Sequence, residues 1–350
     1  MITTLKDVSR LADVSLTTVS HVVNGTRPVS EKLRARVEAA IRQIGYTPNS
    51  LARSLKLSSS RTLGLAIQDI RNPHFTEIVY ALEERARERG FTLLLSDFGD
   101  DPARESDALR VFVERRVDGL IIAPTSNGAA ALAWLRGRGV PAVQIDRIAD
   151  PGFDYVVVSN HAATRRLVTH LCQKGHRRIA MLGGLMGLST SRERVAGYRR
   201  ALRDAGLPVD PGLIVVGCSQ PESARIATHA LLDQAAPPTA IVAGNNLKAL
   251  GALRALGERN LRVPEDVALV SFDDFPWADL FRPRLTTAAQ PCRALGERAV
   301  DLLLDRIRDP GLAPRHVRLG VEIRHRESCG CAAGAPFSPT TPHVPTSKSV

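Results

Sequence analysis

The stretch Val14–Ser30 reads VSLTTVSHVVNGTRPVS and decides how the N-terminal part of this chain folds. Ser15 is suited to cap a helix, because a serine oxygen can accept a backbone N–H of the first turn. One face of that helix carries branched apolar side chains at helical spacing, Val19, Val22 and Val23. The opposite face carries short or hydrogen-bonding side chains, Leu16, Thr17, Ser20 and His21. Such groups suit base edges and thymine methyls, so we interpret the stretch as the second helix of a helix-turn-helix and the turn after it.

The flanking residues predict a helix on either side. Thr4 can cap a first helix, with Asp7 in a box-like position three residues later. Asp13 stands where the turn needs a residue that tolerates a left-handed backbone. Ser30 can cap a third helix, and Gly45 ends it. Three short helices with a shared core predict a small all-α DNA-binding domain over residues 1–48.

Charge distribution supports an anionic partner for this end of the chain. The whole chain has 350 residues and a net charge of +11. Residues 1–61 hold ten Lys and Arg against four Asp and Glu, a net charge of +6. More than half of the excess positive charge therefore lies in less than a fifth of the chain, as expected for a nucleic-acid-binding head on a nearly balanced body.

A short amphipathic segment follows the head. Residues 49–60 can form a helix with Leu51, Ala52 and Leu55 on one face, but a helix this short is marginal in isolation. The stretch KDVSRLADVSLTTVSHVVNGTRPVS, followed by GYTPNSLARSLK, resembles the head and hinge of the lactose-repressor/galactose-repressor (LacI/GalR) family, most closely its purine-repressor branch. The resemblance implies double-stranded operator DNA as a partner and makes 49–60 a hinge helix and linker.

The resemblance also implies roles for individual residues of the head and hinge. Those facing bases would be Leu16, Thr17, His21 and Leu55, with Leu55 wedged between base pairs in the minor groove. Those holding the DNA backbone would be Ser15, Thr18, Asn24, Arg27, Tyr46 and Ala52. Leu16 stands where many relatives have a polar residue, so the base that it contacts stays open.

From residue 61 onward, apolar runs typical of strands alternate with segments of helical spacing. Strands are expected at 92–96, 119–123, 142–145, 179–182, 240–243 and 268–271, among others. This alternation predicts an α/β body of two parallel, doubly wound sheets. The resemblance implies a two-lobed fold like that of periplasmic binding proteins, with the chain crossing three times between lobes. Lobe 1 would take about 61–160 and 291–318, and lobe 2 about 161–290 and 319–331.

Ligands of open α/β sheets bind beyond the carboxyl ends of the strands, and polar side chains collect at these positions. We expect a small-molecule effector to bind Asn72, Phe75, Asp146, Arg147, Arg194, Asn245 and Asp273. Arg194 in RERVAGY and Asp273 in VSFDDF match effector-binding segments of the family, and Asn246 replaces the family's acid in AGNNLKALG. Asp69, Asp97, Thr125 and Ser189 also follow strands, although Asp69 and Asp97 can equally cap turns. A sugar is the first candidate, a nucleoside or nucleobase the second, and a protein or phosphosugar co-effector the third.

Other classes of function find less support in the sequence. No nucleophile-elbow motif, P-loop or dinucleotide fingerprint indicates an enzyme or a cofactor. Cys329 and Cys331 lack obvious partner ligands nearby in the sequence, so no metal is expected. Scattered cysteines and the absence of a signal segment favour the cytoplasm, and no apolar run suggests a membrane span. The alternative is a transport-type solute-binding protein without a DNA role.

The C-terminal residues bear on assembly. Residues 332–350 are rich in Pro, Ser and Thr and are expected to be disordered. They lack the leucine heptads with which some relatives form tetramers, so we expect a homodimer.

Overall fold

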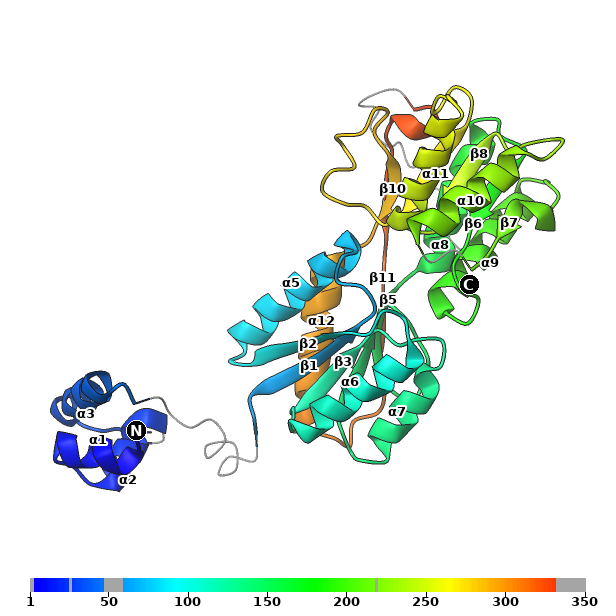
Figure 1. Ribbon diagram of the computed structural model, residues 1–350. Helices are drawn as coiled ribbons and strands as arrows, with labels where there is room; N and C mark the ends of the chain where they lie inside the picture. Colours follow the sequence, from blue (N-terminus) through cyan, green and yellow to red (C-terminus); the bar gives the residue numbers. More distant parts are fainter. Residues whose placement is uncertain (1–2, 25–26, 47–58, 218–219, 332–350) are drawn as a thin grey trace, which may run out of the picture. The chain divides into compact units, whose positions relative to one another are not determined.

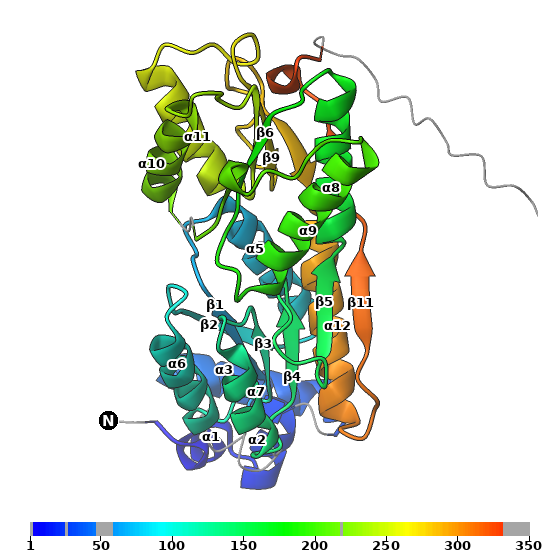
Figure 2. The same cartoon turned by 90° about the vertical axis from the view of Figure 1, so that its right-hand side faces the viewer.

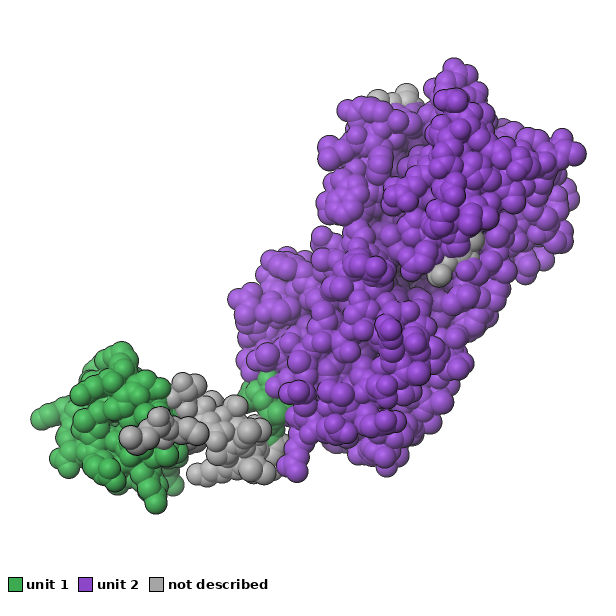
Figure 3. All heavy atoms as spheres, viewed as in Figure 1, with its two compact units in different colours: residues 1–61 green, residues 62–350 purple. Residues whose placement is uncertain are grey.

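The computed structural model describes residues 3–24, 27–46, 59–217 and 220–331. The chain divides into two compact units, residues 1–61 and 62–350 (Figure 3). No helix among the described residues is long and apolar enough to cross a membrane.

The head consists of three helices, α1 (Leu5–Ala12), α2 (Leu16–Asn24) and α3 (Glu31–Ile44). Two of the predicted caps form: the Asp7 carboxylate accepts the Thr4 backbone N–H at 2.9 Å, and Ser15 Oγ accepts the Thr18 N–H at 3.0 Å. Ser30 stands at the N-cap position of α3, but its side chain makes no capping hydrogen bond. Asp13 takes a left-handed backbone with φ 46°, as the turn requires. The buried core is made of Val8, Ala12, Val19, Val37, Ala40 and Tyr46.

Lobe 1 is built on a six-stranded sheet in the order β11-β5-β4-β3-β1-β2. Its strands, all parallel, are β1 (Thr62–Ile67), β2 (Thr92–Asp97), β3 (Gly119–Ile122), β4 (Ala142–Ile145), β5 (Asp154–Val158) and β11 (His316–Leu319). Its helices are α5 (Pro73–Glu88), α6 (Pro102–Glu114), α7 (Gly128–Arg136) and α12 (Cys292–Arg308). Helices α5 and α12 lie side by side on one face, and α6 and α7 cover the other (Figures 1 and 2).

Lobe 2 repeats this plan with the order β12-β10-β9-β8-β6-β7. Its strands are β6 (Ile179–Leu182), β7 (Ile214–Val215), β8 (Ala240–Ala243), β9 (Ala268–Phe272), β10 (Thr286–Ala289) and β12 (Glu322–Arg324). Its helices are α8 (Asn160–Gln173), α9 (Ser189–Asp204), α10 (Pro221–Leu232) and α11 (Asn246–Glu258). The sheet is not wholly parallel, because edge strand β12 runs antiparallel to β10.

The chain passes between the two sheets three times, after β5, after β10 and after β11. These crossings place α12 and β11 in lobe 1, and β12 with the short 3-10 helix Glu327–Cys329 in lobe 2. Burial follows from the layering: in both sheets the central strands are fully buried, since helices cover both faces.

Candidate functional site

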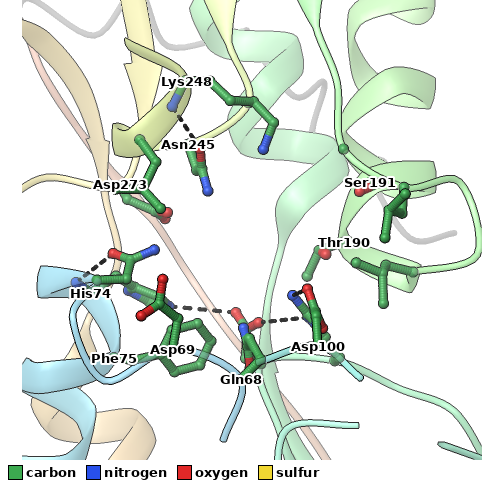
Figure 4. Close-up of a pocket in the computed structure, with 18 of the residues that line it drawn as sticks. Gln68, Asp69, His74, Phe75, Asp100, Thr190, Ser191, Asn245, Lys248 and Asp273 are labelled. Carbon is green, nitrogen blue, oxygen red and sulfur yellow. Dashed lines mark hydrogen bonds and ion pairs between the residues drawn. The ribbon is translucent and has the colours of Figure 1, made fainter. Parts of the chain in front are cut away.

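A cavity of about 360 Å³ lies between the two lobes, where the carboxyl ends of strands from both sheets meet. All seven residues expected to bind an effector line it: Asn72, Phe75, Asp146, Arg147, Arg194, Asn245 and Asp273. In Figure 4, Asp69 and Phe75 from lobe 1 lie across an open space from Asn245, Lys248 and Asp273 from lobe 2. The cavity is therefore lined by residues of both lobes, and its size depends on the separation of the two lobes.

Two aspartates occupy equivalent places in the two lobes. Asp146 directly follows β4, and Asp273 directly follows β9. Both have a left-handed backbone, with φ 64° and φ 67°. Their N–H groups donate to the adjoining strand, Asp146 to Val156 O at 3.1 Å and Asp273 to Ala288 O at 3.0 Å. A left-handed conformation is unfavourable for a residue other than glycine, and such residues cluster at binding sites.

Arg194 is held in place by contacts on several sides. It lies on α9 and is buried, with Nε donating to Asn160 Oδ1 at 2.8 Å and Nη1 donating to Gly244 O at 2.5 Å. Its Nη2 lies 3.9 Å from the Asp273 carboxylate, and its guanidinium lies 3.7 Å from the centre of the Phe272 ring. Burial lowers the pKa of Arg194, and the Asp273 carboxylate opposes that shift. The result is a preorganised, planar donor beside the cavity.

Arg147 is the corresponding cation of lobe 1. Its Nη1 donates to Asp100 at 2.5 Å, and its Nε lies 3.6 Å from the Asp146 carboxylate as an ion pair. Nε is buried and makes no hydrogen bond to the described part of the chain. A buried N–H group without an acceptor is unfavourable, so this nitrogen is a candidate donor to a bound molecule.

His74 is a component of the site that the sequence did not reveal. It lies in the first turn of α5 and is only 3% exposed. Its Nε2 lies 3.5 Å from the Asp146 carboxylate, and its ring meets Phe75 edge to face. Burial alone would lower the pKa of His74, but Asp273, Cys292 and Asp146 together outweigh it and hold that pKa well above its ordinary value. Its positive charge is thus favoured at the cavity wall.

The two lobes are joined by hydrogen bonds beside the cavity. Asn72 caps α5, its Oδ1 accepting the His74 N–H at 3.1 Å, and it also accepts Asn246 Nδ2 from lobe 2 at 2.9 Å. Ile148 N–H of lobe 1 donates to Ser189 Oγ of lobe 2 at 2.9 Å. The Asn246 amide therefore serves as a link between the lobes.

Three residues that follow strands do not line this cavity. Asp97 accepts the N–H groups of Ile70 and Gly99, so the turn-capping interpretation is confirmed for it. Thr125 donates to buried Glu105 at 2.7 Å, and Ser189 makes the contact between lobes. Residues that the sequence reasoning missed include Gln68, Asp100, Thr190, Ser191 and Lys248. Their signal is weak, because most of them sit in loops or first helical turns rather than directly after a strand.

The DNA-reading candidates of the head have different surroundings. Ser15, Leu16 and Thr17 are exposed, Leu16 by 44%, whereas His21 is half-buried. The hydroxyls of Ser15 and Thr18 lie 2.8 Å apart, and Arg27 is exposed. Tyr46 is 7% exposed and packs in the head core, so its ring stabilises the head, and its DNA contact stays a prediction. Leu55, Ala52 and the side chain of Asn24 lie outside the described residues.

A helix-turn-helix head on a two-lobed ligand-binding body defines a class of protein, the DNA-binding transcriptional regulator controlled by a small molecule. Comparison with known proteins supports this class for both parts. Residues 4–49 match the bacterial regulatory proteins of the lacI family, and residues 168–329 match a periplasmic binding protein-like domain.

Individual relatives cover nearly the whole chain. The ribose operon repressor of Escherichia coli (strain K12) is 38% identical over 327 residues, 93% of this chain and 99% of the relative. The repressor PurR of Escherichia coli O139:H28 is 36% identical over 341 residues, 95% of this chain and 98% of the relative. The lac repressor dimer bound to operator and the anti-inducer ONPF matches with a TM-score of 0.84 and 31% identity, over 94% of this chain and 99% of that one.

The chain belongs to the lacI family of bacterial regulatory proteins. It is a DNA-binding transcriptional repressor controlled by an effector, and the alternative of a transport-type solute-binding protein is not supported.

Proposed function

We propose that the effector is a monosaccharide held between the lobes by Asp146 and Arg147 from lobe 1 and by Arg194, Asn245 and Asp273 from lobe 2. The observation that carries the proposal is the convergence of all five on one cavity. Carboxylates each accept several hydroxyls, and guanidinium groups donate in pairs, so this set suits a ring with many hydroxyls.

The aromatic content of the cavity also favours a sugar over a purine. Among the described lining residues, Phe75 is the sole Phe, Tyr or Trp, so one apolar face is available for ring C–H groups. A flat base gains most when aromatic rings stack on it, whereas a sugar gains most from hydroxyl contacts. The relatives include a ribose operon repressor and a regulator, CelR, in complex with cellobiose; CelR matches with a TM-score of 0.72 and 31% identity over 93% of this chain and 99% of that one. Ribose is therefore the first sugar to test.

In the proposed mechanism, a homodimer in the cytoplasm places two heads on a pseudo-palindromic operator. The effector bridges the lobes and changes their separation, which alters the spacing of the two segments at 49–60 and orders or melts their helices. This is an order–disorder switch, and ligand affinity and DNA affinity are then coupled reciprocally.

A ligand screen tests the proposal. The full chain would be heated with ribose, other pentoses, hexoses, ribonucleosides and hypoxanthine, and its melting temperature recorded. A ligand at 100 times its Kd stabilises the folded state by about 2.7 kcal/mol, which shifts the melting temperature by several degrees. A shift with one sugar alone supports the proposal, and a shift confined to nucleosides or bases contradicts it. Operator affinity with and without that ligand, on a site selected from random duplexes, then tells inducer from co-repressor.

The hinge role has its own test in Leu55→Ala. We expect operator affinity to fall by about 10- to 100-fold, roughly 1.4–2.8 kcal/mol, because the wedge that the family resemblance implies is lost. Effector affinity should stay unchanged, and Leu55→Met, which conserves volume, should stay near wild type. Fluorescence anisotropy of labelled operator at several salt concentrations measures the operator affinity of both variants. Unchanged operator affinity in the alanine variant would refute the hinge role.

A further inference from the structure

Four side chains typical of metal ligands gather in lobe 2, away from the effector cavity. One ligand atom from each of His170, His325, Cys329 and Cys331 lies within 4.8 Å of those of the others. Nε2 of His170 lies 3.2 Å from Cys329 Sγ and 3.4 Å from Cys331 Sγ, and the two imidazole centroids are 4.3 Å apart. The sequence-based expectation that the cysteine pair lacks partner ligands is therefore wrong, because the fold supplies two histidines.

The four groups come from two segments that contacts outside the cluster also hold together. His170 lies in the last turn of α8, while the other three lie between β12 and the end of the described chain. Ser328 anchors the latter segment, its Oγ accepting Thr286 N–H at 2.8 Å and donating to Leu269 O at 2.6 Å. Lys174 Nζ donates to Gly330 O at 3.2 Å. Contacts outside the cluster thus hold the cysteine pair against α8.

We propose that His170, His325, Cys329 and Cys331 form a tetrahedral zinc site. Two sulfur and two nitrogen ligands are a preferred set for structural Zn²⁺, whereas Mg²⁺ and Ca²⁺ require oxygen ligands. With Zn–S near 2.3 Å and Zn–N near 2.0 Å, a tetrahedron places neighbouring ligand atoms about 3.5 Å apart. The two N–S distances of His170 are already close to that separation, and the remaining pairs of ligand atoms, all within 4.8 Å, would move closer together to receive the ion.

The charge balance of the cluster suits this ion. His170 and His325 would bind the ion as neutral imidazoles, the form of histidine that coordinates metals. Cys329 and Cys331 would bind it as thiolates, the form that a coordinated dication stabilises. Two thiolates neutralise Zn²⁺, so the bound site adds no net charge beside Lys174.

The position of the site indicates what the ion would do. It would tie α8 to the segment that follows edge strand β12, after the last crossing between lobes. None of the four residues lines the effector cavity, so the ion would stabilise lobe 2 rather than contact the effector. The proposal is independent of the identity of the effector.

Metal content of the full chain is the direct test. The protein would be reduced, reconstituted with Zn²⁺, freed of loosely bound ion by gel filtration and measured by plasma mass spectrometry. We expect one zinc per chain in the wild type and less than a tenth of that in Cys331→Ala and His325→Ala. Cys172→Ala, which removes a buried thiol of α8 outside the cluster, should keep its zinc. Replacement with Co²⁺ should give the absorption of a thiolate-bound tetrahedral ion.

Clear outcomes would overturn the proposal. Reconstituted wild type without stoichiometric zinc would do so, even if the cluster variants failed to fold. So would cluster variants that retain zinc, or a cobalt spectrum without thiolate absorption. Thiol counting decides one further case. If the reduced protein takes up no metal, and Cys329 and Cys331 form a disulfide once the reductant is removed, the pair is a redox couple and not a zinc site.

Discussion

The two lobes have the same strand order, and each places an aspartate with a left-handed backbone after its fourth strand. The surroundings of these two aspartates differ. Asp146 of lobe 1 lies against two cationic side chains, His74 and Arg147. Asp273 of lobe 2 accepts Gln290 Nε2 at 2.6 Å and lies 3.9 Å from Arg194. A repeated fold thus provides equivalent positions, and the neighbouring residues decide their chemistry.

Replacing Arg194 of lobe 2 should have the largest effect on effector affinity and on stability. In Arg194→Met, the groups it contacts, Asn160 Oδ1, Gly244 O and the Asp273 carboxylate, lose their donor inside a buried site. We expect effector affinity to fall by more than about 100-fold and the body to lose roughly 3–5 kcal/mol of stability. Calorimetric titration and urea unfolding measure the two effects.

Arg200→Met provides the matched control for that experiment. Arg200 lies on the same helix and pairs with Asp204, but its side chain is 59% exposed. An exposed ion pair contributes about 0–1 kcal/mol, so this variant should behave like wild type. Equal losses in the two variants would mean that α9 tolerates no change there, and Arg194 would have no special role.

A second pair of variants compares the two aspartates directly. Asparagine tolerates the left-handed backbone, so Asp273→Asn and Asp146→Asn remove charge with little strain. Hydrogen bonds to charged groups contribute about 1.5–3 kcal/mol, so each variant should bind the effector roughly 10- to 100-fold more weakly. Both variants should also destabilise the unliganded protein, because Asp146 pairs with His74 and Asp273 pairs with Arg194 inside a buried site. Weakening by only one of the two would show that a single lobe carries recognition.

Much of the fold was predictable from local patterns. Strands expected at 142–145, 179–182 and 240–243 coincide with β4, β6 and β8, because apolar runs and turn residues bound them in the sequence. Strand β10 was missed: its sequence TTAA has no large apolar side chain, and it is buried because it lies between β9 and β12. The parallel sheets were predicted correctly, but edge strand β12, which runs antiparallel to β10, was not expected, because three residues carry no periodic signal.

The site was predictable where residues directly follow strands or stand in segments that resemble the family, such as Arg194 in RERVAGY. Asp146 and Asp273 could be located because the carboxyl ends of parallel strands form the binding edge. His74 became part of the site only through packing of α5 against Asp146. The cluster at Cys329 depends on His170, which lies 159 residues away along the chain. Contacts of such separation leave no trace in a local pattern.

A smaller effect is expected at the hydrogen bond between the lobes. Asn246→Ala removes the donor to Asn72 Oδ1 but leaves Asn245, which accepts the Lys248 N–H at 3.0 Å, as the cap of α11. Such a bond contributes about 0.5–1.5 kcal/mol, so the contact between the lobes weakens and effector affinity falls by roughly 2- to 10-fold. Asn127→Ala, at an exposed position of lobe 1, serves as the control in the same titration. An unchanged effector affinity would show that effector binding does not depend on this contact between the lobes.

The smallest effect is the pH dependence of stability, which we expect to depend on the protonation of one residue of lobe 1, His74. The pKa of His74 is raised in the folded protein by Asp273 and Asp146 despite burial, and Cys292 also lies near its ring, Sγ being 3.4 Å from Nδ1. A raised folded pKa contributes stability that is fully present below the unfolded value, about 6.5, and is lost as pH rises through the folded value. Melting temperatures of the unliganded wild type should therefore decline relative to His74→Gln from about pH 6.5 upward. Asp146→Asn should reduce that decline, since it removes one of the two carboxylates, and an identical pH profile in all three proteins would show that His74 is neutral in the fold.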